Sequence, residues 1–452
     1  MRRSLVPLIL LTAACSEVPE PNAGPDTEIR SAPVGSTFDR YATIEFESPD
    51  AADGFECRLG DANWQGCQSP TILTELELGA QRFEVRATGG GAADLTPASA
   101  EWTIVSVFGA PGAPVASGMP TPDPDPDGGS FRIQCAVSHF AYDDPIVSPG
   151  SPGAAHLHMF MGNEESDFSS TVESMFTTGE ATCHGSELNR SSYWTPSLLA
   201  PEFDAGGAMV VRPDGAPELR PVLPSADLDN PHIYYKSGSD ELSAIEPMPY
   251  GLRMIVGDAS ASGPIPEKTI NIRWSCESWP IDDYLDFSQS IPACAIGDRV
   301  ALTIAFPPCW NGVDLDSPDH QSHMSEVTFT QGRGIHCSAS HPVTLPKVSY
   351  NMFFPVTAES AGPEGDSRWW RLASDRYAVD PDASPGGYSL HADWFMAWHP
   401  EVMEAAVEFC IGAGRSCSDG DLGNGWRLAG VVAPAITYPE DVRQVSMQAH
   451  LH

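Results

Sequence analysis

Lysine is almost absent from this chain, which has three lysines (Lys236, Lys268 and Lys347) among 452 residues. Aspartate and glutamate together number 61, and the formal net charge at pH 7 is −37. Binding to a phosphate backbone depends on clustered lysine and arginine, so this composition argues against a nucleic-acid partner. Acidity of this size is more typical of a protein that stays soluble in a salty or calcium-rich medium.

Several sequence signatures are also missing. The chain has no Cys-x-x-Cys pair, no His-Glu-x-x-His helix, no Gly-x-Ser-x-Gly elbow, no P-loop and no dinucleotide fingerprint. Zinc held by thiolates is therefore not expected, and a metal would have to be bound by histidine and carboxylate. Beyond the N-terminal segment, no run approaches the roughly 20 apolar residues of a membrane-spanning helix.

The N-terminus has the pattern of a targeting segment. Arg2 and Arg3 precede the apolar run Leu5 to Leu11, and small residues then lead directly to Cys15. We predict a lipoprotein signal peptide over residues 1–14, lipidation of Cys15, and a spacer over residues 15–30. Ser16 after the cysteine favours the outer membrane, and membrane contact would come through the lipid anchor only. The alternative is an ordinary cleaved signal, which would release the protein.

Without Cys15, ten cysteines remain, an even number in a chain bound for an oxidising compartment. Such a set predicts a disulfide framework. In the C-terminal part of the chain the pairs that we expect are Cys410 with Cys417 and Cys309 with Cys337. The connectivity of the other cysteines of that part stays open.

Residues 31–106 have the alternating pattern of a small β-domain. Apolar and polar residues alternate over Phe55–Leu59 and Phe83–Thr88, between turn signals. Residues 25–106 resemble the bacterial immunoglobulin-like repeats, with a Phe-Glu-Cys strand, a second cysteine ten residues later, a Phe-Glu-Val-Arg-Ala strand and a closing Trp102-Thr103-Ile104. The resemblance implies a sandwich with a Cys57–Cys67 disulfide that acts as a spacer or adhesive module.

A segment rich in proline and aspartate, residues 107–129, is predicted to link this domain to a large unit over residues 130–440. Apolar stretches with the look of strands recur in the large unit between proline and glycine residues, among them Ala208–Val211, Val300–Phe306 and Val348–Phe354. One helix is predicted to begin at Pro400, with an apolar side that includes Phe409. The expected fold is mainly β, disulfide-bonded, with few helices.

The large unit carries a series of motifs in a fixed order. They are Asp144-Pro145-Ile146-Val147, His156-Leu157-His158, Tyr193-Trp194-Thr195-Pro196, Pro249-Tyr250-Gly251-Leu252-Arg253, Pro307-Pro308-Cys309-Trp310-Asn311-Gly312, Asp319-His320-Gln321-Ser322-His323 and His391-Ala392-Asp393-Trp394-Phe395. Over residues 130–415 the chain resembles DUF1996, a secreted family of unknown function often fused to WSC-type carbohydrate-binding modules. The resemblance implies an extracellular setting and a polysaccharide partner, such as a cell-wall glycan, but no mechanism.

Histidine and aspartate residues of these motifs form the candidate site. A His-x-His pair on a strand points both rings to one face, which suits two ligands of one ion. We take zinc or copper as the candidate cofactor, with His156, His158, His320 and His323 as metal ligands. The candidate catalytic residues are Asp144, His156, His158, His391 and Asp393. Catalysis or ligand binding without metal, and a purely structural role, remain open alternatives.

Aromatic residues lie beside the histidine motifs. We predict that Trp194, Trp310 and Trp394 bind a ligand, because aromatic faces stack on sugar rings. The alternative is core packing. The leading hypothesis is an envelope protein that binds, and in an open alternative cleaves, a polysaccharide in a cleft lined by His, Asp and Trp. A non-catalytic adhesin and a surface metal-binding protein are the alternatives, and whether the chain is an enzyme stays undecided.

Overall fold

The computed structural model describes residues 24–74, 76–109, 114–116, 118–225, 231–265, 271–277 and 287–436. The chain divides into two compact units, with the boundary between Val105 and Ser106. The predicted signal peptide and Cys15 lie outside the described residues, so their roles stay predictions. Among the described helices, none is long and apolar enough to cross a bilayer.

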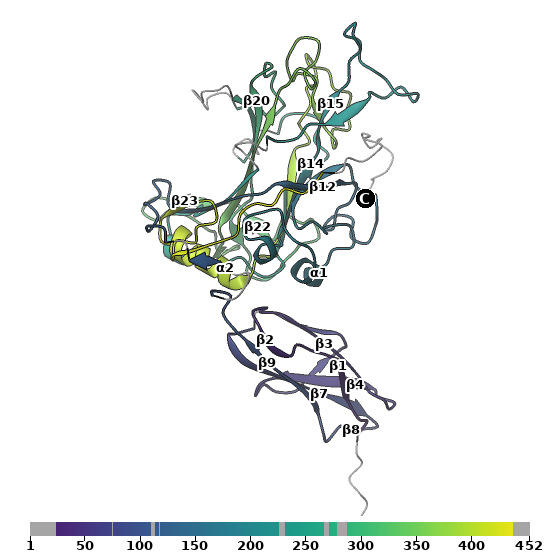
Figure 1. The fold of residues 1–452 in the computed structure, drawn as a ribbon, viewed down its shortest axis with the longest axis vertical. Helices are drawn as coiled ribbons and strands as arrows, with labels where there is room; N and C mark the ends of the chain where they lie inside the picture. The colour runs from purple at the N-terminus through teal and green to yellow at the C-terminus, as the bar shows by residue number, and fades with distance from the viewer. Residues whose placement is uncertain are drawn as a thin grey trace, which may run out of the picture. The chain divides into compact units, whose positions relative to one another are not determined.

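The N-terminal unit is built from two sheets (Figure 1). The first has the order β1-β3-β6, and the second has the order β2-β9-β7-β4-β5 with β8 paired to β7. The strands are β1 (Glu28–Ser31), β2 (Gly35–Thr37), β3 (Ala42–Glu47), β4 (Gly54–Leu59), β5 (Gln65–Cys67), β6 (Thr71–Leu73), β7 (Gly79–Gly89), β8 (Ala92–Ala93) and β9 (Ala98–Ile104).

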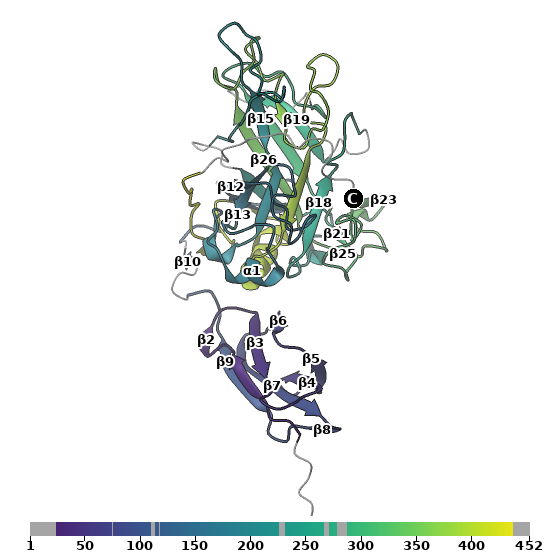
Figure 2. The same cartoon turned by 90° about the vertical axis from the view of Figure 1, so that its right-hand side faces the viewer.

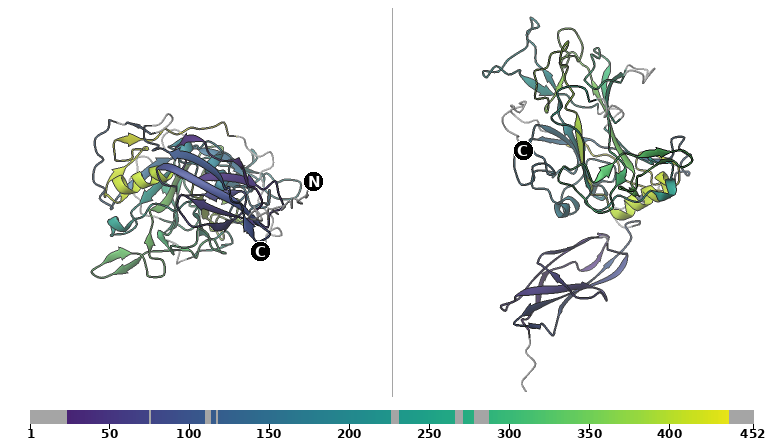
Figure 3. Two further views of the ribbon diagram at one scale, coloured as in Figure 1. Left: turned by 90° about the horizontal axis from the view of Figure 1, so that it is seen from below. Right: turned by 180° about the vertical axis from the view of Figure 1, so that it is seen from behind.

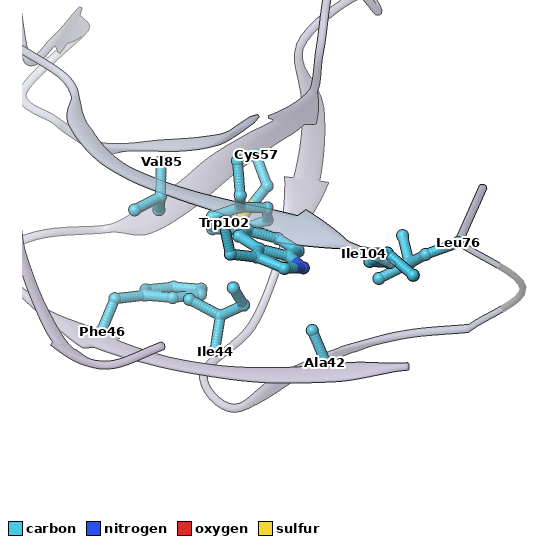
Figure 4. Close-up of a cluster of buried hydrophobic side chains, with 9 residues drawn as sticks. Ala42, Ile44, Phe46, Cys57, Leu76, Val85, Trp102 and Ile104 are labelled. Carbon is cyan, nitrogen blue, oxygen red and sulfur yellow. The ribbon is translucent and has the colours of Figure 1, made fainter. Parts of the chain in front are cut away.

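The two sheets share one hydrophobic core. Ile44 and Phe46 come from β3, whereas Val85 and Trp102 come from β7 and β9 of the other sheet. Trp102 lies at the centre of this cluster (Figure 4). The Cys57–Cys67 disulfide forms as expected between β4 and β5. The likeness to immunoglobulin-like repeats stays a prediction.

The large unit contains two main sheets that supply most of its strands (Figure 2). The six-stranded sheet has the order β19-β20-β26-β17-β11-β29, and the five-stranded sheet has the order β12-β13-β14-β28-β18. Their strands are β11 (Ser130–Gln134), β12 (Val137–Ala141), β13 (His158–Gly162), β14 (Ser192–Pro196), β17 (His232–Lys236), β18 (Arg253–Gly257), β19 (Ile272–Glu277), β20 (Arg299–Ala305), β26 (Lys347–Pro355), β28 (His391–Phe395) and β29 (Ser416–Cys417).

Shorter strands complete the unit in four small groups, β10-β30, β16-β15-β27, β22-β21-β25 and β23-β24. Their bounds are β10 (Val115–Ala116), β15 (Leu198–Pro201), β16 (Leu219–Pro221), β21 (Cys309–Trp310), β22 (Met324–Ser325), β23 (Thr328–Thr330), β24 (Gly334–His336), β25 (Val343–Thr344), β27 (Arg371–Leu372) and β30 (Trp426–Arg427). The fold is therefore mainly β, as predicted. The predicted strand Ala208–Val211 is wrong, since Met209 and Val211 form only isolated bridges within turns.

Helices are few and short. They are α1 (Val172–Thr177), two 3-10 turns (Ser186–Leu188 and Leu242–Ala244) and α2 (Pro400–Ala406), which continues as a π-helical turn over Val407–Ile411. Helix α2 is the yellow-green coil in Figure 3, and it begins at Pro400 as predicted. The π-helical turn changes the register, so that Cys410 and Ile411 are buried and Phe409, expected on the apolar side, is exposed.

Five disulfides fix the two units. The expected pairs Cys309–Cys337 and Cys410–Cys417 are confirmed. The two pairs that the sequence left open are Cys135–Cys183 and Cys276–Cys294. Cys135 follows β11, and its bridge ties the end of the six-stranded sheet to the segment that leads into β14.

Candidate functional site

One face of the five-stranded sheet brings together residues from three strands. His158 begins β13, and His391 and Asp393 both lie on β28. Trp194 of β14, the strand between them, pairs with Phe160 on one side and with Asp393 on the other. Because residues two apart on a strand share a face, and so do residues paired across strands, these side chains all point to the same side.

Two further groups reach this face from the loop between β12 and β13. Asp144 is fixed there because its Oδ1 accepts hydrogen bonds from the backbone N–H groups of Ile146 and Val147, at 2.8 and 2.9 Å. The loop closes where the Ala155 N–H donates to the Tyr142 carbonyl, at 2.9 Å. His156 follows at once, just before the strand. We call Asp144, His156, His158, His391 and Asp393 the His/Asp cluster.

The side chains of the cluster are close enough to share a ligand. The imidazole centroid of His156 lies 4.2 Å from that of His158 and 4.9 Å from that of His391. One nitrogen of each of these three rings lies within 4.8 Å of the others, and so do ligand atoms of Asp144, His158 and Asp393. His158 belongs to both groups and therefore sits at the centre of the cluster.

Backbone carbonyls fix the orientation of two of the rings. The Nδ1 of His158 lies 2.9 Å from the Asp143 carbonyl oxygen, and the Nδ1 of His391 lies 2.8 Å from the Ser389 carbonyl oxygen. A carbonyl oxygen only accepts, so each Nδ1 carries the proton and donates. The Nε2 atom of each neutral ring is then left with a free lone pair. Metal-bound histidines in proteins are commonly held in this way.

Buried polar atoms inside the cluster lack hydrogen-bond partners. Among the described residues, neither His158 Nε2 nor either carboxylate oxygen of Asp393 has one. The nearest approach of Asp393 to a basic nitrogen is 4.0 Å, between its Oδ2 and His391 Nε2. An unsatisfied buried polar group costs about 1 to 3 kcal/mol, and more if it is charged. The cluster therefore carries binding capacity that the described protein atoms do not use.

Burial also sets the protonation of these groups. It lowers the pKa of His158 to about 4, and burial with the nearby His158 ring lowers the pKa of His391 to about 4. Burial, with the Asp144 carboxylate as a second cause, raises the pKa of Asp393 well above its usual value. Burial raises the pKa of Asp144 as well, partly offset by the backbone N–H groups of Val147 and Ile146 that donate to it. At neutral pH both rings are neutral and able to ligate.

Three imidazoles with a nearby carboxylate form a donor set that suits zinc or copper. In a tetrahedral zinc site, ligand atoms about 2.0–2.2 Å from the ion lie roughly 3.4 Å from one another. The cluster atoms lie within 4.8 Å, so shifts of side chains alone would close the site. Two carboxylates would also balance the charge of a divalent ion, which is favourable in a buried position.

The other two predicted metal ligands lie in the loop that runs along β18. His323 is buried with both ring nitrogens engaged, Nδ1 with Ser317 Oγ at 2.9 Å and Nε2 with the Arg253 carbonyl at 2.7 Å. His323 therefore braces this loop and has no nitrogen left for an ion. His320 is half-buried and bonds Asp316 at 2.9 Å, which raises its pKa. The structure does not bring either ring into the cluster's ligand groups.

The predicted aromatic ligand-binding residues need correction. Trp194 and Trp394 are fully buried, so neither ring is open to stack on a sugar. Trp194 stacks on Phe160 with ring centroids 5.3 Å apart, and Trp394 packs near Tyr235 on the opposite face of the sheet. Trp310 is half-buried and donates its indole N–H to the Asp314 carbonyl at 2.7 Å. Core packing, the alternative reading of the sequence, explains Trp194 and Trp394.

Two contributors to the site were not found from sequence. Asp143 acts through its backbone carbonyl, which no side-chain pattern reveals. Gly257 of β18 pairs with His391 and has φ +104°, and a Cβ at this position would lie 2.6 Å from the His391 Cα. Only glycine therefore lets the edge strand approach β28 so closely. In the sequence, Gly257 follows an apolar stretch, and nothing in that pattern indicates the close approach to β28.

The chain matches the model of one protein family. The model of a family described as "Domain of unknown function (DUF1996)" matches residues 144–398, a range that begins at Asp144 and includes all five residues of the His/Asp cluster. A search of curated proteins found no match.

Proposed function

The chain belongs to the DUF1996 family, and from this premise we propose that its large unit is a metal-binding domain of the cell envelope. The proposed ion is zinc or copper, held by His156, His158 and His391 with Asp393 as the nearest carboxylate. The observation that carries the proposal is the set of buried, unsatisfied acceptor atoms on His158 and Asp393. A divalent ion would satisfy them together.

The arrangement has the features of a site prepared before the ion arrives. The rings of His158 and His391 are oriented by the carbonyls of Asp143 and Ser389, and their low pKa keeps them unprotonated. His156 is the member of its triad that is not fully buried, so we propose that the ion enters past this ring. Such preorganisation lowers the cost of binding.

The extracytoplasmic setting belongs to the same proposal. Lipidation at Cys15 and a periplasmic or surface location rest on the sequence pattern, and five disulfides are in keeping with an oxidising compartment. A hydrolytic or oxidative reaction on a glycan at this centre stays a prediction. Sugar stacking in a cleft of Trp194 and Trp394 is not carried forward, because both rings are buried.

Metal analysis of the mature protein, purified without a histidine tag, tests the proposal. The expected result is about one zinc or copper ion per chain, removed by a chelator and restored by reloading. His158→Asn is the critical variant, because the Asn amide N–H can still donate to the Asp143 carbonyl while the ligand nitrogen is gone. His323→Asn, at a buried histidine with no free nitrogen, is the matched control. Folded protein that stays metal-free after reloading with both ions would falsify the proposal.

A further inference from the structure

Basic residues of this acidic chain gather on the outward face of the six-stranded sheet. Lys236 of β17 and Lys347 of β26 stand directly opposite each other on neighbouring strands. They are the only lysines among the described residues, since Lys268 lies outside them. Like charges in paired positions repel and destabilise a sheet. In a protein of net charge −37, this pairing is unlikely on composition alone and points to an anion that both would bind.

Arg132 extends the same surface. It pairs with Tyr234 across β11 and β17, so its side chain points to the same side as that of Lys236, two residues from Tyr234. The Arg132 guanidinium and the Lys236 ammonium lie 5.9 and 4.9 Å from the centroid of the Tyr234 ring. One aromatic ring is thus flanked by two cations. We call Arg132, His232, Tyr234, Lys236 and Lys347 the basic face.

The charges of the basic face are only partly balanced within the protein. Arg132 donates to Ser416 Oγ at 2.6 Å and makes a longer contact with the Cys417 carbonyl, neither of them an anion. Among the described residues, Lys236 has no carboxylate partner, and it is exposed. Lys347 lies 3.7 Å from a carboxylate oxygen of Glu326. Two of these three cations therefore have no acidic partner in the described structure.

Two hollows adjoin this surface. The first, of about 190 Å³, is lined by Arg132, Ile133, Gln134, His232, Tyr234, Ser418 and Asp419. The second, of about 270 Å³, shares Ser418 and Asp419 with the first and extends along Pro120 to Asp123. Asp419 has φ +55°, a left-handed conformation that few residues other than glycine, asparagine and aspartate adopt. Together the hollows form an elongated depression that begins at the basic face.

We propose that the basic face binds an acidic polysaccharide, a glycan whose sugar rings carry carboxylates. Arginine and lysine would bind the carboxylates, and the Tyr234 ring holds the Arg132 and Lys236 cations near each other for this purpose. Gln134 and Asp419 in the first hollow provide an amide and a carboxylate that suit sugar hydroxyl groups. The inference does not rest on the metal centre, since none of these residues belongs to the His/Asp cluster.

A membrane surface fits the basic face less well. Peripheral membrane binding combines cations with exposed apolar side chains that enter the bilayer. Among the described residues, the large exposed apolar side chains include none from β11, β17 or β26. The polar neighbours Gln134 and Asn351, paired with His232 on either side, favour a hydroxyl-rich ligand instead.

Binding to soluble polymers tests the proposal on the metal-loaded and the metal-free protein. The probes are polygalacturonate as the carboxylate glycan, dextran as a neutral glycan and dextran sulfate as a sulfated one, in calcium-free buffer. Polygalacturonate is expected to bind in a manner that weakens with salt, and dextran is not expected to bind. Lys236→Gln and Tyr234→Ala should each weaken binding about tenfold, the size expected for one charge-assisted or stacking contact.

Arg333→Gln is the matched control, because it removes one positive charge that Glu241 already pairs. It should leave affinity unchanged, and metal content should stay the same in all variants. No binding of polygalacturonate, equal affinity for dextran sulfate, or equal losses in Arg333→Gln and Lys236→Gln would each overturn the assignment. If polygalacturonate does not bind while the metal content is normal, the metal proposal still stands. If polygalacturonate binds to a protein that holds no metal, the proposal for the basic face still stands.

Discussion

The two faces of the five-stranded sheet in the large unit differ in how their hydroxyl, imidazole and carboxylate groups are hydrogen-bonded. On the inner face, the hydroxyl of Tyr193 lies 2.8 Å from that of Tyr235, which also accepts the indole N–H of Trp398 at 2.8 Å. Tyr350 donates its hydroxyl to the Asp393 carbonyl at 2.6 Å. These hydroxyl groups are all paired, and their network joins the two main sheets, although the Trp394 indole N–H on the same face has no partner among the described residues.

The outer face carries the His/Asp cluster, where His158 Nε2 and both carboxylate oxygens of Asp393 lack partners among the described residues. Asp393 belongs to both faces, since its backbone carbonyl serves the inner network and its side chain points into the cluster. Satisfied polar groups stabilise a core, whereas unsatisfied ones cost stability. This difference supports our proposal, in which the inner face stabilises the fold and the outer face binds an ion.

Removal of one ligand nitrogen should have the largest effect. His158→Asn is expected to lower zinc or copper affinity at least tenfold, because it deletes a central ligand atom and keeps the bond to the Asp143 carbonyl. Equilibrium dialysis against a competing chelator measures this affinity. Unchanged affinity would show that the outer face is no more a ligand site than the inner one.

Acid should destabilise the metal-free protein through the outer face. Burial lowers the pKa of His158 and His391 to about 4, so the folded protein keeps neutral rings at pH values where the unfolded chain has already taken up protons. The free energy of unfolding therefore falls as pH drops from about 6.5 to about 4, by up to about 3 kcal/mol per ring. The raised pKa of Asp393 acts in the opposite direction and offsets part of this loss.

Urea unfolding of the chelated protein at several pH values measures this effect. The double variant His158→Asn/His391→Asn is the control, because the pH dependence of its stability contains no contribution from these two imidazoles. The difference between the two curves isolates the histidine contribution, and a difference that is flat between pH 4 and 6.5 would contradict the prediction.

Tyr235→Phe should lower the free energy of unfolding without changing the metal content. Loss of this hydroxyl deprives Tyr193 and Trp398 of a partner in a fully buried position, which we expect to cost about 2 kcal/mol. Chemical unfolding gives this value, and metal analysis on the same sample should match the unmodified protein. A change in metal content without a loss of stability would reverse the roles that we assign to the two faces.

Asp393→Asn should have the smallest effect on the metal-free protein. Burial and the neighbouring Asp144 raise the pKa of Asp393, which favours the neutral carboxyl group. We expect the neutral amide to change the free energy of unfolding by less than about 1 kcal/mol, as measured by chemical unfolding. Metal affinity should nevertheless fall. A destabilisation of about 3 to 5 kcal/mol would instead indicate that Asp393 is ionised and paired with a protonated histidine.

Disulfides between cysteines close in sequence could be predicted, whereas those that depend on the fold could not. Cys410 and Cys417 are seven residues apart in sequence, so chain proximity alone favours this pair. Cys135 and Cys183 meet only because the chain returns from the five-stranded sheet to the end of β11. Rules that pair cysteines from sequence do not describe this course of the chain.

The cluster was predictable within each motif and not between motifs. His391 and Asp393 lie two residues apart on β28 and share a face, because strand alternation has a period of two. His156 precedes the strand, so its ring meets His158 through the turn of the loop and not through alternation. Sequence patterns alone could not separate His320 and His323 from the true neighbours of His158, because strand order decides which motifs meet. Burial of Trp194 and Trp394 depends on strand order in the same way.

The most direct test of the two-face account is a crystal structure of the metal-loaded protein, with data collected at the absorption edge of zinc or copper. Anomalous scattering locates the ion without reference to any assumed ligand. The account predicts one strong peak within bonding distance of His158 Nε2 and His391 Nε2, on the side of the sheet that carries Asp393. A peak confined to other histidines, with the cluster empty and His158 unliganded, would contradict the central claim.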